Sequence, residues 1–183
     1  MTRKNRTRYV LLGLLANRAR SGYDLKRAVE QSIGHFWHES YGQIYPHLKR
    51  LEEEGLAQVE RIIEEGRPQR KLYRITEEGH EELRLWLEES VQESKPRNEL
   101  LLKLFFGKRV KSEISISHLE SFMSELEVRR QLLETIRGEM DDSLHTRADA
   151  KFWMMSLRFG ILECEARIQW AKESLAILRD AEF

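Results

Sequence analysis

The chain is poor in cysteine and has no long apolar run. Its one cysteine, Cys164, excludes a disulfide framework and a cage of metal-binding thiolates. No stretch approaches the roughly 18 consecutive apolar residues that a membrane-spanning helix needs. We therefore expect a cytoplasmic protein with no segment inside a membrane.

Residue patterns typical of enzymes are also missing. The sequence contains no glycine-rich phosphate loop and no serine, histidine and aspartate in an order typical of hydrolases. Cys164 lies in an apolar pattern, where a thiol is unreactive. His35, His38 and Glu39 could be read as metal ligands, but a zinc site needs a fourth ligand at a defined spacing. We expect no enzyme activity, no cofactor and no metal.

The charge of the chain is divided unevenly. Aromatic residues make up 9% and charged residues 34%, a composition that favours a helix-rich protein. Residues 1–75 contain 15 Lys and Arg against 9 Asp and Glu, a net +6, whereas residues 76–183 contain 16 against 22, a net −6. A basic first part predicts a polyanionic partner for that part, with chance asymmetry as the alternative. Residues 2–8 carry four cations, either as an arm that contacts phosphates or as a solvated terminus: Arg3, Lys4, Arg6 and Arg8.

Residues 40–55, SYGQIYPHLKRLEEEG, are predicted to form an amphipathic helix. Ser40 can cap its start, and Gly55 can adopt the left-handed conformation that ends it. Pro46 lies inside the pattern and should kink or tighten the first turns. The apolar positions of one side follow helical spacing, at Ile44, Leu48 and Leu51.

The other side of this helix is polar and basic. Cations neutralise phosphates, while amides and hydroxyls can read base edges in a major groove. We therefore predict a DNA-reading helix in which Lys49 and Arg50 bind phosphate and the remaining residues contact bases or sugars. An ordinary solvated helix is the alternative. The predicted DNA-contacting residues are Tyr41, Gln43, Tyr45, His47, Lys49 and Arg50.

Two helices and a hairpin are predicted to flank this segment. Helical spacing predicts helices over residues 7–17 and 21–34. Strands are predicted at 56–63 and 71–75, joined by a turn that contains Gly and Pro. Three helices followed by a hairpin form the winged helix-turn-helix arrangement, whose wing grips the DNA backbone. The predicted wing contacts are Arg67, Gln69, Arg70 and Lys71.

The rest of the chain is predicted to be helical. A fourth helix carries Leu83, Trp86 and Leu87 on its inner side, and residues 90–98 form a linker. Residues 99–110 are predicted to form a short helix that is apolar on most sides and buried between partners. We expect a DNA-binding domain over residues 1–90 and a helical dimerisation domain over 91–183.

Two long helices end the chain, and the last of them is predicted to dimerise. Residues 115–141 form the first, and the second begins near Asp149. The last helix carries two apolar stripes and therefore needs two partners, the neighbouring helix and a second chain. A closed bundle within one chain is the competing account. One stripe runs through Leu157, Ile161, Cys164, Ile168, Ala171, Leu175 and Leu178. The residues of it that we assign to the dimer are Leu157, Ile161, Cys164, Ile168, Leu175 and Leu178. The other stripe consists of Phe152, Met155, Phe159, Leu162, Ala166 and Trp170.

Several of these segments share their pattern with a known family. They are YVLLGLLANRARSGYDLKRAVE at residues 9–30, GQIYPHLKRLEEEGL at 42–56 and KLYRITEEG at 71–79, with the Gly-Arg-Pro turn between the last two. Together they resemble the PadR family of transcriptional regulators. MSLRFGILECEARIQWAKESL, at residues 155–175, resembles the last helix of the longer members, whose C-terminal domain is of the virulence-activator alpha type.

The resemblance implies a sequence-specific transcriptional regulator that binds DNA as a homodimer. Most members of the family repress, and many release DNA when a small aromatic compound binds. A protein-interaction adaptor that no longer binds DNA specifically is the alternative, and salt-sensitive DNA binding would separate the two. The sequence adds candidate linings for an effector pocket, although a tryptophan at helical spacing is more often part of a core: Trp37, Trp86, Trp153 and Trp170, with Phe152 and Met154.

Overall fold

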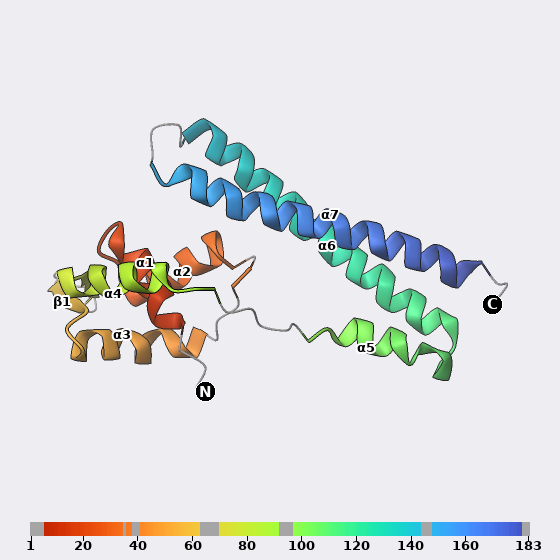
Figure 1. The fold of residues 1–183 in the computed structure, drawn as a ribbon, viewed down its shortest axis with the longest axis horizontal. Helices are drawn as coiled ribbons and strands as arrows, with labels where there is room; N and C mark the ends of the chain where they lie inside the picture. Colours follow the sequence, from red (N-terminus) through yellow and green to blue (C-terminus); the bar gives the residue numbers. More distant parts are fainter. Residues whose placement is uncertain are drawn as a thin grey trace. The chain divides into compact units, whose positions relative to one another are not determined.

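The chain folds into two compact units, Met1–Glu93 and Ser94–Phe183 (Figure 1). The first contains helices and a two-stranded antiparallel hairpin, and the described part of the second is helical. The prediction of a mainly helical fold with a small β-hairpin is confirmed. This computed structural model describes residues 6–34, 36–37, 41–62, 70–91, 97–143 and 148–180.

The first two helices form where their sequence signals predict. They are α1 (Thr7–Ala16) and α2 (Gly22–Ser32). The backbone N–H of Asp24 donates to the Ser21 hydroxyl at 3.2 Å, and the backbone N–H of Ser21 donates to the Asp24 carboxylate at 3.0 Å. This reciprocal capping box satisfies backbone donors at the start of α2. Gly34 closes the other end, where its N–H bonds back to the last turn at 2.9 Å.

A 3₁₀ turn (Tyr41–Gln43) leads into α3 (Ile44–Glu53). Pro46 is the third residue of α3, so its nitrogen is among the first four, whose N–H groups have no partner within a helix. The proline therefore removes no bond from the α3 ladder. A 3₁₀ turn lies just before α3, and the prediction that Pro46 kinks or tightens the first turns stays a prediction.

Gly55 ends α3 in the left-handed conformation, with φ of 73°. Its N–H bonds to the carbonyl of Glu52 at 3.1 Å, and the N–H of Leu56 bonds to the carbonyl of Leu51 at 2.8 Å. This pair of bonds is a Schellman motif, which satisfies carbonyls at the helix end. The chain leaves the motif directly into the first strand.

The hairpin pairs β1 (Ala57–Ile62) with β2 (Arg70–Ile75) in antiparallel register. Residues 63–69, which include the predicted turn, lie outside the described residues. Arg20, between the first two helices, adds a β-bridge to β2. Its N–H donates to the carbonyl of Tyr73 at 3.0 Å and its carbonyl accepts from the Tyr73 N–H at 2.9 Å. The bridge fixes the start of α2 against the hairpin.

Thr76 joins the start of α4 (Glu77–Glu88) to the end of α3. Its hydroxyl accepts the N–H of Gly79 at 3.1 Å and donates to the carbonyl of Gly55 at 2.7 Å. Gly79 packs so closely that a Cβ built on it would collide with the carbonyl oxygen of Leu56. The N-terminus of α4 is therefore held against the C-terminus of α3 by the Thr76 cap and by close backbone packing.

One core lies beneath these elements, and α4 packs on it through Leu83 and Trp86. The Trp86 ring stacks on Tyr9 with centroids 4.5 Å apart. The prediction that Leu87 faces inward is wrong, since its side chain is 67% exposed. The packed side of α4 runs through Gly79, Leu83 and Trp86, and Leu87 lies beside it. The buried residues of this core are Tyr9, Leu11, Leu12, Leu15, Leu25, Ile44, Leu48, Leu51, Leu56, Ala57, Tyr73 and Ile75.

Replacing Gly79 by alanine is expected to lower the free energy of unfolding by about 1–3 kcal/mol, because overpacking against backbone forces a shift. Urea denaturation followed by circular dichroism would measure the change. Gly13→Ala is the matched control, because no atom outside α1 lies within 4 Å of its Cβ position. The control should keep or raise stability by up to about 1 kcal/mol. Equal stabilities of the two variants would contradict the close packing at Gly79.

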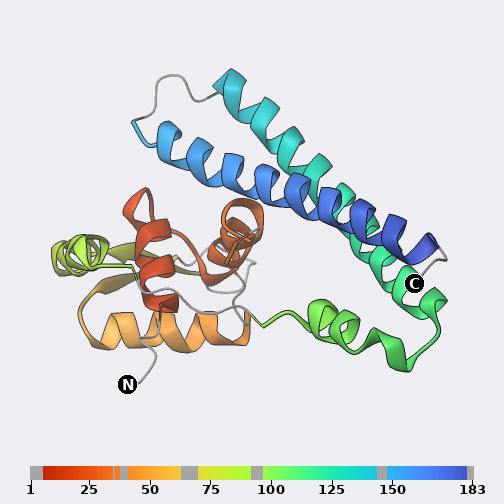
Figure 2. The same cartoon turned by 45° about the vertical axis from the view of Figure 1, so that its right-hand side comes forward.

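The C-terminal unit consists of α5 (Glu99–Phe105), α6 (Ser112–Ser143) and α7 (Ala150–Arg179), with a 3₁₀ turn (Gly107–Arg109) after α5. Figures 1 and 2 show α6 and α7 side by side. The single helix predicted over 99–110 is too long, since α5 ends at Phe105. Within one chain none of its residues is buried, and the Phe105 side chain is 82% exposed.

The α7 stripe that we assigned to a dimer packs against α6 of the same chain. Cys164 and Ile161 are almost fully buried there, opposite Leu126 and Leu133. The assignment was wrong because consecutive antiparallel helices provide the nearest apolar partner for each other. Within the single chain, five of the six predicted dimer residues are buried in two hydrophobic clusters, and Leu178 is partly buried against the second of these: Leu157, Ile161, Cys164, Ile168, Leu175 and Leu178.

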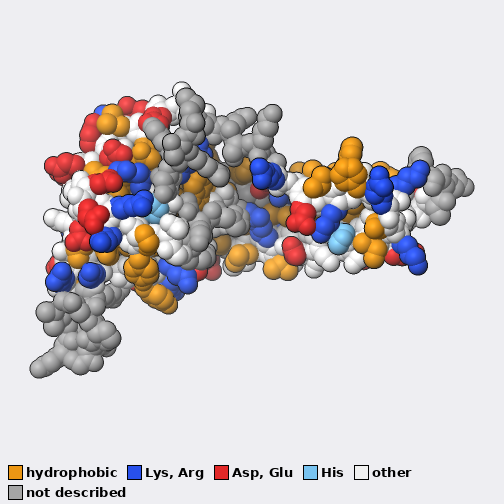
Figure 3. Space-filling model, turned by 90° about the horizontal axis from the view of Figure 1, so that it is seen from below, with side chains coloured by type: hydrophobic (Ala, Val, Ile, Leu, Met, Phe, Trp, Pro, Cys, Tyr) orange, Lys and Arg blue, Asp and Glu red, His pale blue; other side chains and the backbone are white. Residues whose placement is uncertain are grey.

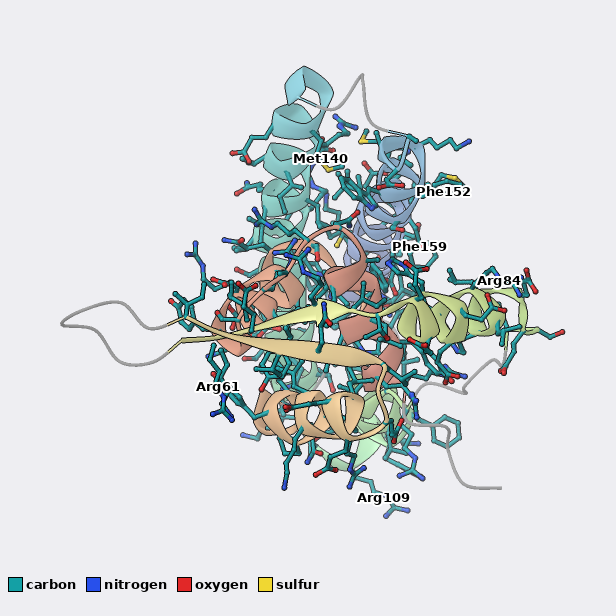
Figure 4. The ribbon with its side chains drawn as sticks, turned by 90° about the vertical axis from the view of Figure 1, so that its left-hand side faces the viewer. Arg61, Arg84, Arg109, Met140, Phe152 and Phe159 are labelled. Carbon is teal, nitrogen blue, oxygen red and sulfur yellow. The ribbon has the colours of Figure 1, made fainter. Side chains whose placement is uncertain are left out.

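The other apolar stripe of α7 is exposed in the single chain. Figure 4 shows Phe152 and Phe159 projecting from α7. Their side chains are 59% and 60% exposed, and those of Met155 and Leu162 are 69% and 46% exposed. The prediction that α7 carries two apolar sides is therefore confirmed, and the side that α6 covers is the one that we had assigned to the dimer.

Candidate DNA-binding surface

Four of the residues predicted to contact DNA lie together on the exposed side of α3 and the turn before it. They are Gln43, Tyr45, Lys49 and Arg50. The Tyr45 side chain is 62% exposed, and the Lys49 ammonium lies 3.5 Å from the Glu53 carboxylate one turn later. An exposed pair of this kind is weak, so Lys49 can exchange Glu53 for a phosphate at little cost. Tyr41 belongs to the 3₁₀ turn, and its side chain lies outside the described ones.

His47 is not on this exposed side. Its side chain is only 4% exposed and faces the core with Ile44, Leu48 and Leu51. The prediction that His47 lies on the exposed side of the helix is wrong. The spacing itself gives the reason, because position 47 is three residues after Ile44 and four before Leu51, on the buried stripe.

A depression of about 810 Å³ lies between the start of α2, the exposed side of α3 and strand β2. Tyr23, Tyr45, Lys49 and Lys71 line it, together with two acidic residues. Tyr73 also lines the depression, where burial raises the pKa of its hydroxyl and the charges of Glu52 and Tyr45 act in the same direction. The Tyr73 hydroxyl therefore stays protonated at neutral pH, and Lys49 and Lys71 supply positive charge.

The wing carries a cation that the sequence reading missed. Arg61 lies directly opposite Lys71 in the hairpin register, and cross-strand partners project from the same face of a sheet. Both side chains are exposed, and Figure 4 shows Arg61 at the hairpin. Pairing the predicted strands residue by residue could have found Arg61. The predicted contacts Arg67 and Gln69 lie outside the described residues, as does the side chain of Arg70.

Arg8 has a structural role instead of belonging to a free basic arm. Its guanidinium lies 2.7 Å from the Glu54 carboxylate at the end of α3 and 3.4 Å from the Glu82 carboxylate on α4. The Tyr9 hydroxyl donates to Glu82 at 3.2 Å. These contacts hold α1, α3 and α4 together, so the expectation that Arg8 reaches a phosphate is wrong. Arg3 and Lys4 lie outside the described residues.

Comparison with known proteins identifies the family. Residues 11–85 match the transcriptional regulator PadR-like family, and residues 96–179 match the virulence activator alpha C-terminal domain. The negative transcriptional regulator PadR of Bacillus subtilis is 32% identical over 136 residues, covering 73% of this chain and 72% of that protein. The chain belongs to the PadR-like family. That family consists of transcriptional regulators and not of enzymes.

Solved structures of PadR-like regulators share the fold over nearly the whole chain. The regulator BC1756 from Bacillus cereus has a TM-score of 0.81 at 28% identity, covering 96% of this chain and 99% of that one. Bacillus subtilis PadR in complex with operator DNA has a TM-score of 0.85 at 23% identity, with the same coverage. The same protein in complex with p-coumaric acid has a TM-score of 0.76 at 22% identity, covering 94% and 98%.

The tryptophans proposed as an effector pocket of this PadR-like chain divide between the two units. Trp86 belongs to the N-terminal core, and Trp170 packs edge-on against Phe122 with centroids 6.0 Å apart. Trp153 lies about 25 Å from Trp170 along α7, so the two cannot line one small pocket. Trp86 and Trp170 are therefore explained by packing, and Trp37 and Trp153 stay predictions.

Membrane and metal features can be judged only in the part of the chain that is described. There, no helix combines the length and apolarity needed to cross a bilayer. In the same residues, no group of three or more His, Cys, Asp or Glu side chains is placed to hold a metal ion. His35, His38 and Glu39, the weak metal candidates, lie outside it.

The Cys164 thiol has the character of a core group. It is 1% exposed between α6 and α7, and burial raises the pKa of the thiol, partly offset by the nearby Arg129 charge. A raised pKa keeps the sulfur protonated at neutral pH, whereas a nucleophile needs the thiolate. Cys164 therefore fills space in the PadR-like helical unit.

Proposed function

We propose that this PadR-like regulator binds a specific DNA sequence through α3 and the hairpin wing. The observation that carries the proposal is the exposed group of Gln43, Tyr45, Lys49 and Arg50 on a helix whose other side is anchored in the core. A helix presented in this way fits the major groove. Bacillus subtilis PadR, which shares the fold, has been solved in complex with operator DNA, and this supports DNA as the partner.

The roles of the residues follow from their chemistry and position. Gln43 and Tyr45, in the first turns, contact base edges, while Lys49 and Arg50 neutralise phosphates. Arg61 and Lys71 grip the backbone from the wing. The side chains that lie outside the described ones keep the contacts predicted from the sequence: Tyr41, Arg67, Gln69 and Arg70.

The first experiment is a gel-shift assay on DNA upstream of the protein's own gene, with an unrelated duplex as control. Regulators of this kind often lie beside the genes they control, so this DNA is the best single probe. A shift of the upstream DNA alone at moderate salt supports the proposal. Binding that is weak and equal on both duplexes at every salt concentration favours the adaptor function.

Lys49→Ala should weaken DNA binding by a similar factor on every sequence and lower the slope of log K against log salt by about one. The reason is that a phosphate contact releases a counterion without reading the base. Titrations by fluorescence anisotropy across salt concentrations measure both quantities. Lys172→Ala, an exposed lysine on α7, is the control. An unchanged slope would remove Lys49 from the DNA contacts.

We further propose that two copies associate through the exposed stripe of α7. Phe152, Met155, Phe159 and Leu162 are spaced three, four and three residues apart, as in a helix–helix seam. On α6, Val128 and Leu132 are also exposed. An exposed apolar stripe of this kind marks an interaction site. Figure 3 shows further hydrophobic side chains exposed among charged ones over the C-terminal unit.

A homodimer implies a pseudo-palindromic operator. Two copies of α3 related by twofold symmetry enter successive major grooves, so the half-sites are separated by one or more turns of about 10 bp. The N-terminal unit then reads DNA, and the C-terminal unit sets the distance between the two reading helices.

Phe159→Glu should convert the dimer to a monomer, because it places a charge in a desolvated apolar seam. Size-exclusion chromatography with light scattering should give twice 21.8 kDa for the wild type and 21.8 kDa for the variant. Lys172→Glu, exposed on another side of α7, should remain dimeric. A monomeric wild type would contradict the dimer, and a dimeric Phe159→Glu would place the interface elsewhere.

The named relatives support repression and release by a small aromatic effector. Bacillus subtilis PadR is a negative regulator, and it has been solved with p-coumaric acid. We expect p-coumaric acid or a related planar acid to shift the tryptophan fluorescence of this protein and to release its DNA. Hexanoate serves as the aliphatic control. Fluorescence and DNA binding that stay constant across a panel of aromatic acids would count against an effector.

A further inference from the structure

Gly22 and Tyr45 come from different helices and meet at the edge of the candidate DNA-binding surface. Gly22 is the first residue of α2, and Tyr45 is the second residue of α3. A Cβ built on Gly22 would lie 2.5 Å from Cε1, 3.0 Å from Cζ and 3.1 Å from Cδ1 of the Tyr45 ring. The ring therefore occupies the space where any other residue would place its side chain.

The backbone at Gly22 does not explain the glycine. Among the described residues, Gly55 alone has a positive φ, so Gly22 has a conformation that any residue can adopt. Glycine is a poor residue for a helix, and alanine would be favoured there on propensity. The contact with Tyr45 is the feature that requires a residue without a side chain.

Tyr45 is placed where its orientation matters. It lies in the first turn of α3, the part of a recognition helix that contacts base edges. Although its ring rests on Gly22, 62% of its surface remains exposed, so one part is fixed by packing and the rest is free for DNA. A hydrogen bond to a base depends on distance and angle, so the reading group must be held in place.

We propose that Gly22 is a positioning residue, which sets the orientation of the Tyr45 ring and so contributes to the discrimination between DNA sequences. The inference rests on the proposed function. Lys49 and Lys71 line the same depression as Gly22 and Tyr45, but the attraction of their charges to phosphate tolerates small displacements. The loss of Gly22 should therefore reduce specific binding and leave non-specific binding intact.

The test is a double-mutant cycle with Gly22→Ala, Tyr45→Ala and the double variant in the full chain. Affinity is measured on the duplex footprinted upstream of the protein's own gene and on a scrambled duplex of the same length. Gly22→Ala should lower the specific affinity roughly tenfold, within the range for one lost base contact. It should leave the scrambled-duplex affinity, the salt slope and the melting temperature unchanged. With Tyr45 already replaced, adding Gly22→Ala should change the specific affinity less than about twofold, since no ring remains to displace.

Two checks separate positioning from a general structural effect. Gly13→Ala, with open space at its Cβ position, is the matched glycine control and should bind both duplexes as the wild type does. In NMR spectra, nuclear Overhauser contacts between the Gly22 Hα protons and the Tyr45 ring should be present in the wild type without DNA.

The outcomes are distinguishable. If the wild type discriminates between the two duplexes and Gly22→Ala binds each of them with the same affinity as the wild type, only the positioning role is overturned. A Gly22→Ala variant that loses affinity for both duplexes equally, melts at a lower temperature, or adds its full effect to that of Tyr45→Ala also overturns it. If the wild type shows no discrimination between any duplexes, the proposed function fails and the inference with it.

Discussion

The burial of one side of α3 is the constraint on which the N-terminal unit depends. Ile44, His47, Leu48 and Leu51 face the core, and this fixes the rotation of the helix about its own axis. A rotation by one residue would be about 100°, enough to turn the polar side inward. The buried stripe therefore decides which residues of α3 can contact DNA. Because His47 belongs to the buried stripe, it is not among the residues that can do so.

Apolar packing holds α3 against the core, and the contacts at its two ends fix its position. At its C-terminal end, the Schellman motif at Gly55, the Thr76 hydroxyl and the Arg8 ion pair with Glu54 join α3 to the hairpin, α4 and α1. At its N-terminal end, Tyr45 rests on Gly22. Apolar burial supplies most of the stability, whereas directional bonds and close packing supply the geometry that recognition needs.

The C-terminal unit shows how far periodicity can be taken. The spacing of apolar residues predicted α6, α7 and the two apolar sides of α7, because a helix places residues three and four apart on one side. It could not assign the sides. Both stripes have the composition of a seam, and only the packing of α6 on Cys164 and Ile161 shows which one the same chain covers. For Leu87, the prediction of a helix was correct, but the predicted buried side was wrong, since Leu87 is exposed beside the side that packs.

The sequence by itself determined the order of the helices and strands, the helix ends that a cap or a glycine marks, and the family, but not the end of α5, which was predicted at Val110 and lies at Phe105. Capping residues, the left-handed glycine and apolar spacing act locally, over a few residues, so they can be read without the fold. Only the tertiary structure decided which apolar stripe of α7 is covered by α6, and why position 22 is a glycine. Each of these depends on residues distant in the sequence, as Gly22 does on Tyr45. Local sequence patterns cannot predict which distant side chain will fill a given space.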